Sequence, residues 1–224
     1  MSLVTEVVAA TPAQLPPLID IGAVALGAVY GATLATSRKA PLIGVLIVAV
    51  MMGVGGSILR DILLNTDVNV LVHGKYMTTV MIGALVGTLI GNKLLRPLWL
   101  ILMLDAVVMG MFVIIGTEKA FLFGMSNTSS IFIGTVAAIG GGILSDVLLG
   151  QQPDIMSRGP WNASIALVCA GWFTIFANLD MITFAEVTTV LLATSIKGMA
   201  LWRGWEAPMP EHLLPTEWIK RTRG

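Results

Sequence analysis

Apolar stretches of about twenty residues recur along the chain, separated by short polar breaks such as Ser37-Arg38-Lys39. A helix needs roughly 20 apolar residues to cross the hydrocarbon core of a bilayer. The pattern predicts an all-α membrane protein with seven transmembrane helices. Their expected ranges are Leu18–Thr36, Pro41–Leu64, Met77–Leu95, Leu98–Thr117, Ser129–Leu149, Trp161–Asn178 and Phe184–Trp202.

The chain also contains an internal repeat with an offset of 85 residues. Segment 55–64 reads GGSILRDILL, and segment 140–149 reads GGGILSDVLL. The same offset pairs Asp20 with Asp105 and Asp61 with Asp146. Each unit contains three predicted spans, an odd number, so the second unit is expected to insert upside down relative to the first. Inverted repeats of this kind place their functional site near the middle of the membrane.

The expected organisation therefore has five parts. They are an extracytoplasmic segment (1–17), a first three-helix repeat (18–96), a second, inverted three-helix repeat (97–180), a seventh transmembrane helix (181–203) and a cytoplasmic tail (204–224).

Composition supports a membrane location and argues against nucleic-acid binding. The chain is 56% hydrophobic and 12% charged, whereas soluble domains carry about 25% charged residues. Its net charge is zero, and no basic patch could follow a phosphate backbone.

Basic residues predict the orientation, because cytoplasmic loops carry an excess of Lys and Arg. One side collects Arg38, Lys39, Lys93, Arg96, Arg158, Arg203, Lys220, Arg221 and Arg223, and the other only Arg60, Lys75 and Lys119. This predicts a multi-pass protein of the inner (plasma) membrane, with the N-terminus outside and the C-terminus in the cytoplasm. Membrane lipid is accordingly an expected partner.

Glycine clusters occur in predicted spans two and five: Gly53, Gly55 and Gly56, and Gly140, Gly141 and Gly142. Glycine destabilises a helix interior by about 1 kcal/mol relative to alanine. We therefore interpret the clusters as kinks or short unwound turns whose freed carbonyls line a water-filled path and bind a monovalent cation. Close helix packing is the alternative. We favour packing for the isolated glycines Gly27, Gly31, Gly83, Gly87 and Gly91.

Ionisable residues complete the candidate ion pathway. Side chains at consecutive helix positions point about 100° apart, so Arg60 is expected to pair with Asp146 of the other repeat rather than with Asp61. The alternative is that Arg60 and Asp61 extend to the membrane surface. The full candidate set is Gly53, Gly55, Gly56, Ser57, Arg60, Asp61, Gly140, Gly141, Gly142, Ser145, Asp146, Asp20 and Asp105.

The remaining charged positions have simpler interpretations. Asp20 and Asp105 lie near the starts of spans one and four, where they either cap helices or line a vestibule. Glu118 and Lys119 are expected to form an interfacial pair, and Lys197 to extend its amine to the membrane surface.

An enzyme is not expected, and neither is a bound cofactor. His73 and His212 are far apart and lie in predicted loops. The sequence shows no metal-ligand spacing and no nucleophile beside a base. Asp61 and Asp146 could form an intramembrane aspartyl pair, but neither lies in a recognisable protease motif.

The doubled glycine and aspartate motif resembles that of the prokaryotic trimeric intracellular cation (TRIC) channels and of a related bacterial glycine-transporter-like family. This resemblance covers about residues 18–202. It implies a homotrimer with one pore in each protomer, lined by spans one, two, four and five, with kinks at both glycine clusters. It also implies transient passage of K⁺ or Na⁺. The basic phosphoinositide-binding motif of animal members is not recognisable in this sequence.

Three functional hypotheses follow. The first is a passive monovalent-cation channel, and the second is a carrier that moves a small solute such as glycine by alternating access. Broken helices and inverted repeats serve both mechanisms. The third, a non-conducting trimeric scaffold, is disfavoured by the charges inside the membrane, because such residues usually mark transport pathways.

Overall fold

Helices make up most of the protein, which is described by a computed structural model over residues 17–94, 98–156 and 161–205. Seven of them have sixteen or more residues within that described part. They are α2 (Pro17–Ser37), α3 (Leu42–Leu63), α5 (Gly74–Leu94), α6 (Leu98–Leu122), α7 (Asn127–Leu148), α8 (Asn162–Ala177) and α9 (Ile182–Arg203). A short α4 (Asn69–Val72) follows α3, and a single 3₁₀ turn, η1 (Asp154–Met156), follows α7.

The helices coincide with the seven segments predicted from the apolar pattern, and the protein is an all-α membrane protein. Five of them, α2, α3, α6, α7 and α9, are long and apolar enough to cross a membrane within the described residues. Helix α8 is apolar but only 16 residues long, and α5 is not among the five. The predicted terminal segments are 1–17 and 204–224, of which residues 1–16 and 206–224 lie outside the described residues.

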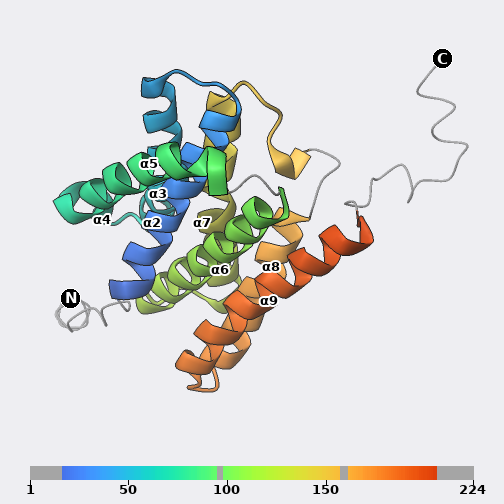
Figure 1. Ribbon diagram of the computed structural model, residues 1–224. Helices are drawn as coiled ribbons and strands as arrows, with labels where there is room; N and C mark the ends of the chain where they lie inside the picture. Colours follow the sequence, from blue (N-terminus) through green and yellow to red (C-terminus); the bar gives the residue numbers. More distant parts are fainter. Residues whose placement is uncertain (1–16, 95–97, 157–160, 206–224) are drawn as a thin grey trace, which may run out of the picture.

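Helix packing follows the internal repeat. Helices α2, α3 and α5 pack against one another, and so do their counterparts α6, α7 and α8. The two units meet where α3 packs on α7 and α2 packs on α6, while α9 covers α6 and α8. Figure 1 shows α2, α3 and α5 on one side of the molecule, α8 and α9 on the other, and α6 and α7 between them. Equivalent parts of the sequence thus make equivalent contacts.

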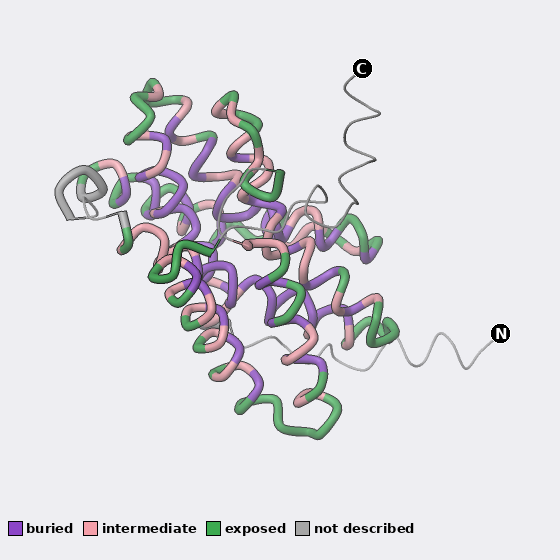
Figure 2. Tube along the Cα trace, turned by 90° about the vertical axis from the view of Figure 1, so that its right-hand side faces the viewer, coloured by how far each residue is buried: buried purple, intermediate pink, exposed green. Residues whose placement is uncertain are grey.

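Small residues let the helices approach closely in the interior. Ala23, Ala28, Ala32 and Ala35 of α2 are all fully buried, as is common where membrane helices pack without a hydrophobic driving force between them. Buried segments follow the middle of the bundle in Figure 2, and helix ends are more exposed. Helix α5 turns large apolar side chains outward, which suits a surface facing lipid; they include Met81, Ile82, Leu85 and Leu89.

The glycine clusters differ from our expectation. Helices α3 and α7 are continuous from end to end, so neither contains the predicted unwound turn. The clusters instead bring these helices into backbone contact. A Cβ on Gly56 would lie 2.0 Å from the carbonyl oxygen of Ala137, and one on Gly141 would lie 2.9 Å from that of Met52. Close packing, the interpretation that we ranked second, is therefore what these glycines provide.

The other cluster members, with one exception, also pack. A Cβ would lie 3.0 Å from the nearest atom of α2 at Gly53 and 3.0 Å from the Leu144 side chain at Gly55. At Gly140 it would lie 2.5 Å from Leu59. The exception is Gly142, which has no such atom within 4 Å.

The packing role expected for the isolated glycines is confirmed for four of them. Gly27 and Gly31 of α2 face the backbone of α3, and Gly83 and Gly87 of α5 face the backbone of α2. At each of the four, a Cβ would lie 3.0 Å or less from a neighbouring atom. Gly91 lies outside the positions whose surroundings the structure describes.

Candidate functional site

A cavity of about 270 Å³ lies among the helices that the two repeats contribute to the centre, α2, α3, α6 and α7. The turn after α7 and residues of α8 and α9 complete its wall. Gly141 and Gly142 of the second glycine cluster line it, as do apolar side chains such as Met52 and Phe112. Its polar lining consists of Tyr30, Arg38, Asp105, Asp146, Gln151, Asp154 and Asn162.

A chain of polar contacts joins the elements at this cavity. The buried amine of Lys197 in α9 donates to Asp105 Oδ2 of α6 and, at 2.7 Å, to Asn162 Oδ1 of α8. The amide nitrogen of Asn162 lies 3.4 Å from Asp154 Oδ2. The backbone N–H of Asp154 in turn donates to Asp146 Oδ2 of α7 at 3.1 Å. Five elements are therefore tied together at the cavity wall.

The charges at the cavity favour a cation. Three carboxylates (Asp105, Asp146 and Asp154) line it together with one guanidinium, that of Arg38. Lys197 adds one more positive charge behind Asp105. Among the described residues, acidic side chains therefore outnumber basic ones at the cavity. Burial raises the pKa of Asp154, which lies in η1 outside the long helices, and the negative charge of Asp105 adds to this shift.

A second charged cluster is buried at the junction of α3 and α6. The carboxylate of Asp61 accepts hydrogen bonds from Arg60 Nε at 2.6 Å and from Lys119 Nζ at 2.7 Å. Asp61 is fully buried, and Arg60 and Lys119 are 2% and 6% exposed. Since charges removed from water are stable only when paired, the three side chains form one unit.

Asp20 belongs to the same end of the molecule. Its Oδ2 accepts a short hydrogen bond from the Tyr76 hydroxyl of α5, and it is buried. We left open whether Asp20 and Asp105 cap helices or line a vestibule. Asp105 lines the cavity, whereas Asp20 joins α2 to α5.

The two motif aspartates share a role that sequence reasoning missed. Asp61 Oδ2 accepts the backbone N–H of Asn69, the first residue of α4, at 3.1 Å. Asp146 Oδ2 accepts the N–H of Asp154, the first residue of η1, also at 3.1 Å. In both repeats the aspartate therefore holds the backbone eight residues further on. The sequence contained a signal for this role, because the spacing between the aspartate and the turn that follows it is the same in both repeats.

The predicted pair between Arg60 and Asp146 is wrong. Arg60 instead binds its sequence neighbour Asp61 through Nε at 2.6 Å, although consecutive side chains point about 100° apart on a helix. Asp146 lies at the cavity, at the other end of the bundle. Asp105 of the cavity and Lys119 of the ion cluster are fourteen residues apart on α6, which corresponds to about 21 Å along a helix.

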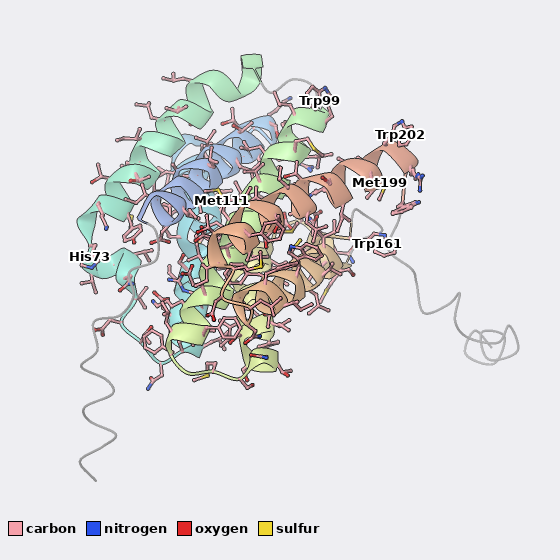
Figure 3. All side chains as sticks on the ribbon, turned by 90° about the horizontal axis from the view of Figure 1, so that it is seen from below. His73, Trp99, Met111, Trp161, Met199 and Trp202 are labelled. Atoms are coloured by element: carbon pink, nitrogen blue, oxygen red, sulfur yellow. The ribbon has the colours of Figure 1, made fainter. Side chains whose placement is uncertain are left out.

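Figure 3 shows the same separation of the two ends. Trp99, Trp161 and Trp202 lie toward one side of the view, and His73 lies on the far side. His73 follows α4 next to the Asp61 cluster, whereas Asn162 and Leu201, which line the cavity, neighbour Trp161 and Trp202 in sequence.

Two further expectations about charged residues are also wrong. Lys197 does not extend to the membrane surface, since it is fully buried and bound to Asp105. Lys119 does not pair with Glu118 but with Asp61. Each lysine binds a carboxylate that belongs to a different helix. A lysine inside an apolar helix is itself a signal for a buried carboxylate partner, but it does not identify that partner.

The remaining candidates, Ser57 and Ser145, are both fully buried. Ser145 Oγ donates to the carbonyl of Gly141, one turn earlier in the same helix, at 2.8 Å. The structure thus divides the predicted pathway set in three. Gly141, Gly142, Asp105 and Asp146 line the cavity, and Arg60, Asp61 and Asp20 lie at the far end. Of the other glycines, Gly55, Gly56 and Gly140 pack α3 against α7, and Gly53 packs α3 against α2.

Comparison with known proteins identifies the family. A family model described as glycine transporter matches residues 17–92 and 102–178. The chain belongs to the glycine transporter family. The two matched segments begin 85 residues apart, the same offset as the doubled motif, so the family unit corresponds to one three-helix repeat. The resemblance to glycine-transporter-like proteins is thereby confirmed.

Curated bacterial membrane proteins of the UPF0126 group are similar to this family member. The Vibrio cholerae protein is 34% identical over 141 residues, which cover 62% of this chain and 59% of that protein. The Escherichia coli inner membrane protein YadS is 32% identical over 147 residues, covering 62% and 68%. The Bacillus subtilis protein YvgT is 28% identical over 174 residues, covering 75% and 85%. The match to the Vibrio protein thus spans less than two thirds of its length.

Solved structures place the fold among TRIC channels. The Rhodobacter sphaeroides orthologue of the trimeric intracellular cation channel aligns with a TM-score of 0.78 and 26% identity, covering 84% of this chain and 98% of that one. Another TRIC cation channel structure aligns with a TM-score of 0.75 and 24% identity, covering 88% and 97%. The family member therefore has the TRIC channel fold, as the sequence motif indicated.

Proposed function

We propose that this protein is a monovalent-cation channel with its pathway inside a single protomer. The observation that carries the proposal is the cavity enclosed by α2, α3, α6 and α7, which is lined by the carboxylates of Asp105, Asp146 and Asp154. A cation is attracted into such a cavity, while an anion is repelled. The similarity to TRIC cation channels supports the same reading.

The proposed path has a wide end and a closed end. A cation enters the cavity past Asp154 and Asp146 and reaches Gly141 and Gly142. From there it passes the contact between α3 and α7 and leaves beside Asp61. The described conformation is closed at that contact, where Gly56 meets Ala137, and at the Asp61 cluster. Opening requires α3 and α7 to separate locally and Lys119 or Arg60 to move aside.

K⁺ and Na⁺ are the proposed transient occupants of this path. A cavity of about 270 Å³ has room for several waters, each of which takes about 30 Å³ in the liquid, so a cation there keeps part of its hydration shell. No group of three or more metal-binding side chains converges within the described residues, an arrangement that suits passage better than retention.

We further propose the assembly and topology expected from the sequence: a homotrimer of seven-span protomers in the inner membrane. In each protomer, residues 18–96 and 97–180 form inverted repeats followed by the seventh helix, with the N-terminus outside and the C-terminus in the cytoplasm. Support comes from the equivalent helix contacts of the two units and from the similarity to channels described as trimeric.

A carrier of a small zwitterion such as glycine is the second candidate. The name of the family favours it. The cavity could also meet both charges of such a molecule, since Arg38 suits a carboxylate, and Asp105 and Asp146 suit an ammonium group. Charged clusters at both ends of the bundle would serve alternating access as well as channel gating.

Two measurements on the purified protein separate these functions. In a planar bilayer, a channel gives discrete current steps whose reversal potential follows the K⁺ gradient. In liposomes, a carrier gives saturable uptake of labelled glycine without such steps. Asp146→Asn is the variant to compare in both assays. It removes a carboxylate from the cavity and leaves the ion pairs of Asp61 with Arg60 and Lys119 intact. Absence of current together with saturable glycine uptake would refute the channel proposal.

A further inference from the structure

Tyr30 of α2 brings a hydroxyl group to the wall of the cavity. The residue is 7% exposed and lines the cavity, so the small surface that it exposes faces that space. Its hydroxyl makes no hydrogen bond to any of the described residues. Among the charged side chains around it, Asp105 of α6 interacts most strongly with this hydroxyl. The Tyr30 oxygen is therefore available to whatever occupies the cavity.

Four helices meet at the level of Tyr30. The next residue of α2, Gly31, packs on α3, since a Cβ there would lie 2.7 Å from Met52 Cβ. Met52 also meets α7, because a Cβ on Gly141 would lie 2.9 Å from its carbonyl oxygen. Asp105 completes this level from α6 through its interaction with Tyr30. The four lining residues Tyr30, Met52, Asp105 and Gly141 form the inner ring of the cavity.

The lining of the cavity changes from polar to apolar at the inner ring. Toward the contact between α3 and α7, it consists of Val108, Met109 and Phe112 of α6 with Ala138 and Ile139 of α7. All five side chains are apolar. Toward the turn after α7, it includes Asp146, Gln151 and Asp154. The inner ring is thus the last polar level of the described lining, where a cation rests before it enters the apolar part.

The inner ring offers two side-chain oxygen atoms to an occupant. Lys197 binds Asp105 Oδ2, whereas Asp105 Oδ1 makes no hydrogen bond within the described part of the chain. The Asp105 side chain is 19% exposed. Tyr30 Oη is the second oxygen, and protein oxygens can replace waters in the hydration shell of a cation. Since Ca²⁺ takes about six to eight oxygen ligands, two such oxygens suit a monovalent cation that keeps part of its water.

We propose that Tyr30 and Asp105 form a binding site for a monovalent cation, in which the Tyr30 hydroxyl replaces one water of hydration. This inference rests on the cation pathway proposed above. The phenol oxygen coordinates the ion through a lone pair, so Tyr30 keeps its proton and stays neutral. Tyr30 thus determines how tightly the cation is held at the inner ring.

The test is the dependence of the current on K⁺ concentration in planar bilayers. Tyr30→Phe removes the hydroxyl and keeps the ring, so the packing of α2 is preserved. This variant is expected to raise the K⁺ concentration that gives half-maximal current by about three- to tenfold, because one polar contact to the ion is lost. An unchanged half-maximal concentration overturns the proposal.

The second tyrosine of the chain provides a matched control. Tyr76 is the only other tyrosine, and its hydroxyl binds Asp20 at the far end of the molecule. Tyr76→Phe is expected to leave the half-maximal K⁺ concentration unchanged, whatever its effect on the size of the current. A rise equal to that of Tyr30→Phe would overturn the proposal, since it would not depend on the position of the hydroxyl.

A second set of variants tests whether Tyr30 and Asp105 bind the same ion. Asp105→Asn/Lys197→Met removes one charge of each sign and the carboxylate oxygen of the site, so it should also raise the half-maximal K⁺ concentration. Tyr30→Phe added to this background should raise it by less than in the unmodified protein, because groups that bind one ion are coupled. Full additivity would separate Tyr30 from Asp105 and overturn the shared site.

Thermal unfolding gives a readout that is independent of current. K⁺ should raise the melting temperature above that in N-methylglucamine chloride of equal ionic strength, because a ligand bound to the folded state stabilises it. The rise should be smaller in Tyr30→Phe and unchanged in Tyr76→Phe. This pattern without any K⁺ current would refute the channel and leave the site standing. Current without any dependence of the half-maximal concentration or of the K⁺ stabilisation on Tyr30 would do the reverse.

Discussion

Two buried charged clusters of this protein join residues that are far apart in sequence. Asp61 is held by Arg60 and by Lys119, 58 residues away, and Asp105 is held by Lys197, 92 residues away. Local sequence does not determine such partners, because they depend on which helices pack together. The sequence analysis therefore assigned Arg60 to Asp146, whereas Arg60 binds Asp61.

The two motif aspartates should respond differently to the same substitution. Asp61→Asn leaves Arg60 and Lys119 buried with too little negative charge, and removing one partner of a buried ion pair costs about 3–5 kcal/mol. Asp146→Asn affects a partly exposed side chain and should change stability by about 1 kcal/mol or less. Thermal unfolding in detergent measures both. Equal stability of the two variants would contradict a structural role for the Asp61 cluster.

Proton uptake by Asp154 should lower the cation current as pH falls. Burial and the charge of Asp105 raise its pKa above the 3.8 of an ordinary aspartate. Asp154 therefore takes up a proton at a higher pH than an exposed carboxyl, and the cavity loses a negative charge there. Among the described residues, Asp105, Asp146, Arg38 and Lys197 are charged groups of the same network.

Current recorded at constant K⁺ over decreasing pH is the measurement. The unmodified protein should lose current in a step centred above pH 3.8, and Asp154→Asn should lack that step and start from a smaller current. A step that persists unchanged in the variant would assign the titration to another group.

At the scale of elements, the apolar pattern predicted the helices well because each one is set by a local run of residues. The unwound turn expected at the glycine clusters does not form, for the opposite reason. Glycine weakens an isolated helix, but in α3 and α7 the loss is offset by contact between the two helices, which propensity does not reveal. Gly56 and Gly141 show this most directly, since each faces a backbone carbonyl of the other helix.

Two alanine substitutions in the clusters should separate packing from pathway effects. A Cβ on Gly56 would lie 2.0 Å from a backbone oxygen of α7, a clash that no side-chain rotation can relieve, whereas Gly142 faces open space in the cavity wall. Gly56→Ala should lower the stability by about 1–3 kcal/mol or more, as overpacking does. Gly142→Ala should leave the stability nearly unchanged. Unfolding temperatures and the oligomer size in detergent decide between these outcomes, and a stable Gly56→Ala protein would contradict the observed crossing of α3 and α7.

At the scale of the molecule, the 85-residue offset was the most productive feature of the sequence. It pairs Asp61 with Asp146, and both of these aspartates hold the start of the next turn. It did not predict how the repeats differ. Those differences arise from single replacements, such as Ser145 opposite Arg60 and Trp161 opposite Tyr76, and from α9, which has no counterpart.

The inverted arrangement requires that the two charged clusters face opposite sides of the membrane. Reporter cysteines can test this with little interference, because the only native cysteine, Cys169, is fully buried. His73 is exposed next to the Asp61 cluster, and Met156 is 68% exposed in the turn beside the cavity. With the N-terminus outside, a membrane-impermeant maleimide should label His73→Cys on intact cells. Met156→Cys should react only after the cells are lysed, and the unmodified protein should not react at all. Labelling of both reporters from the same side would place both clusters on one face of the membrane, and neither a pathway between them nor the inverted repeat could then be maintained.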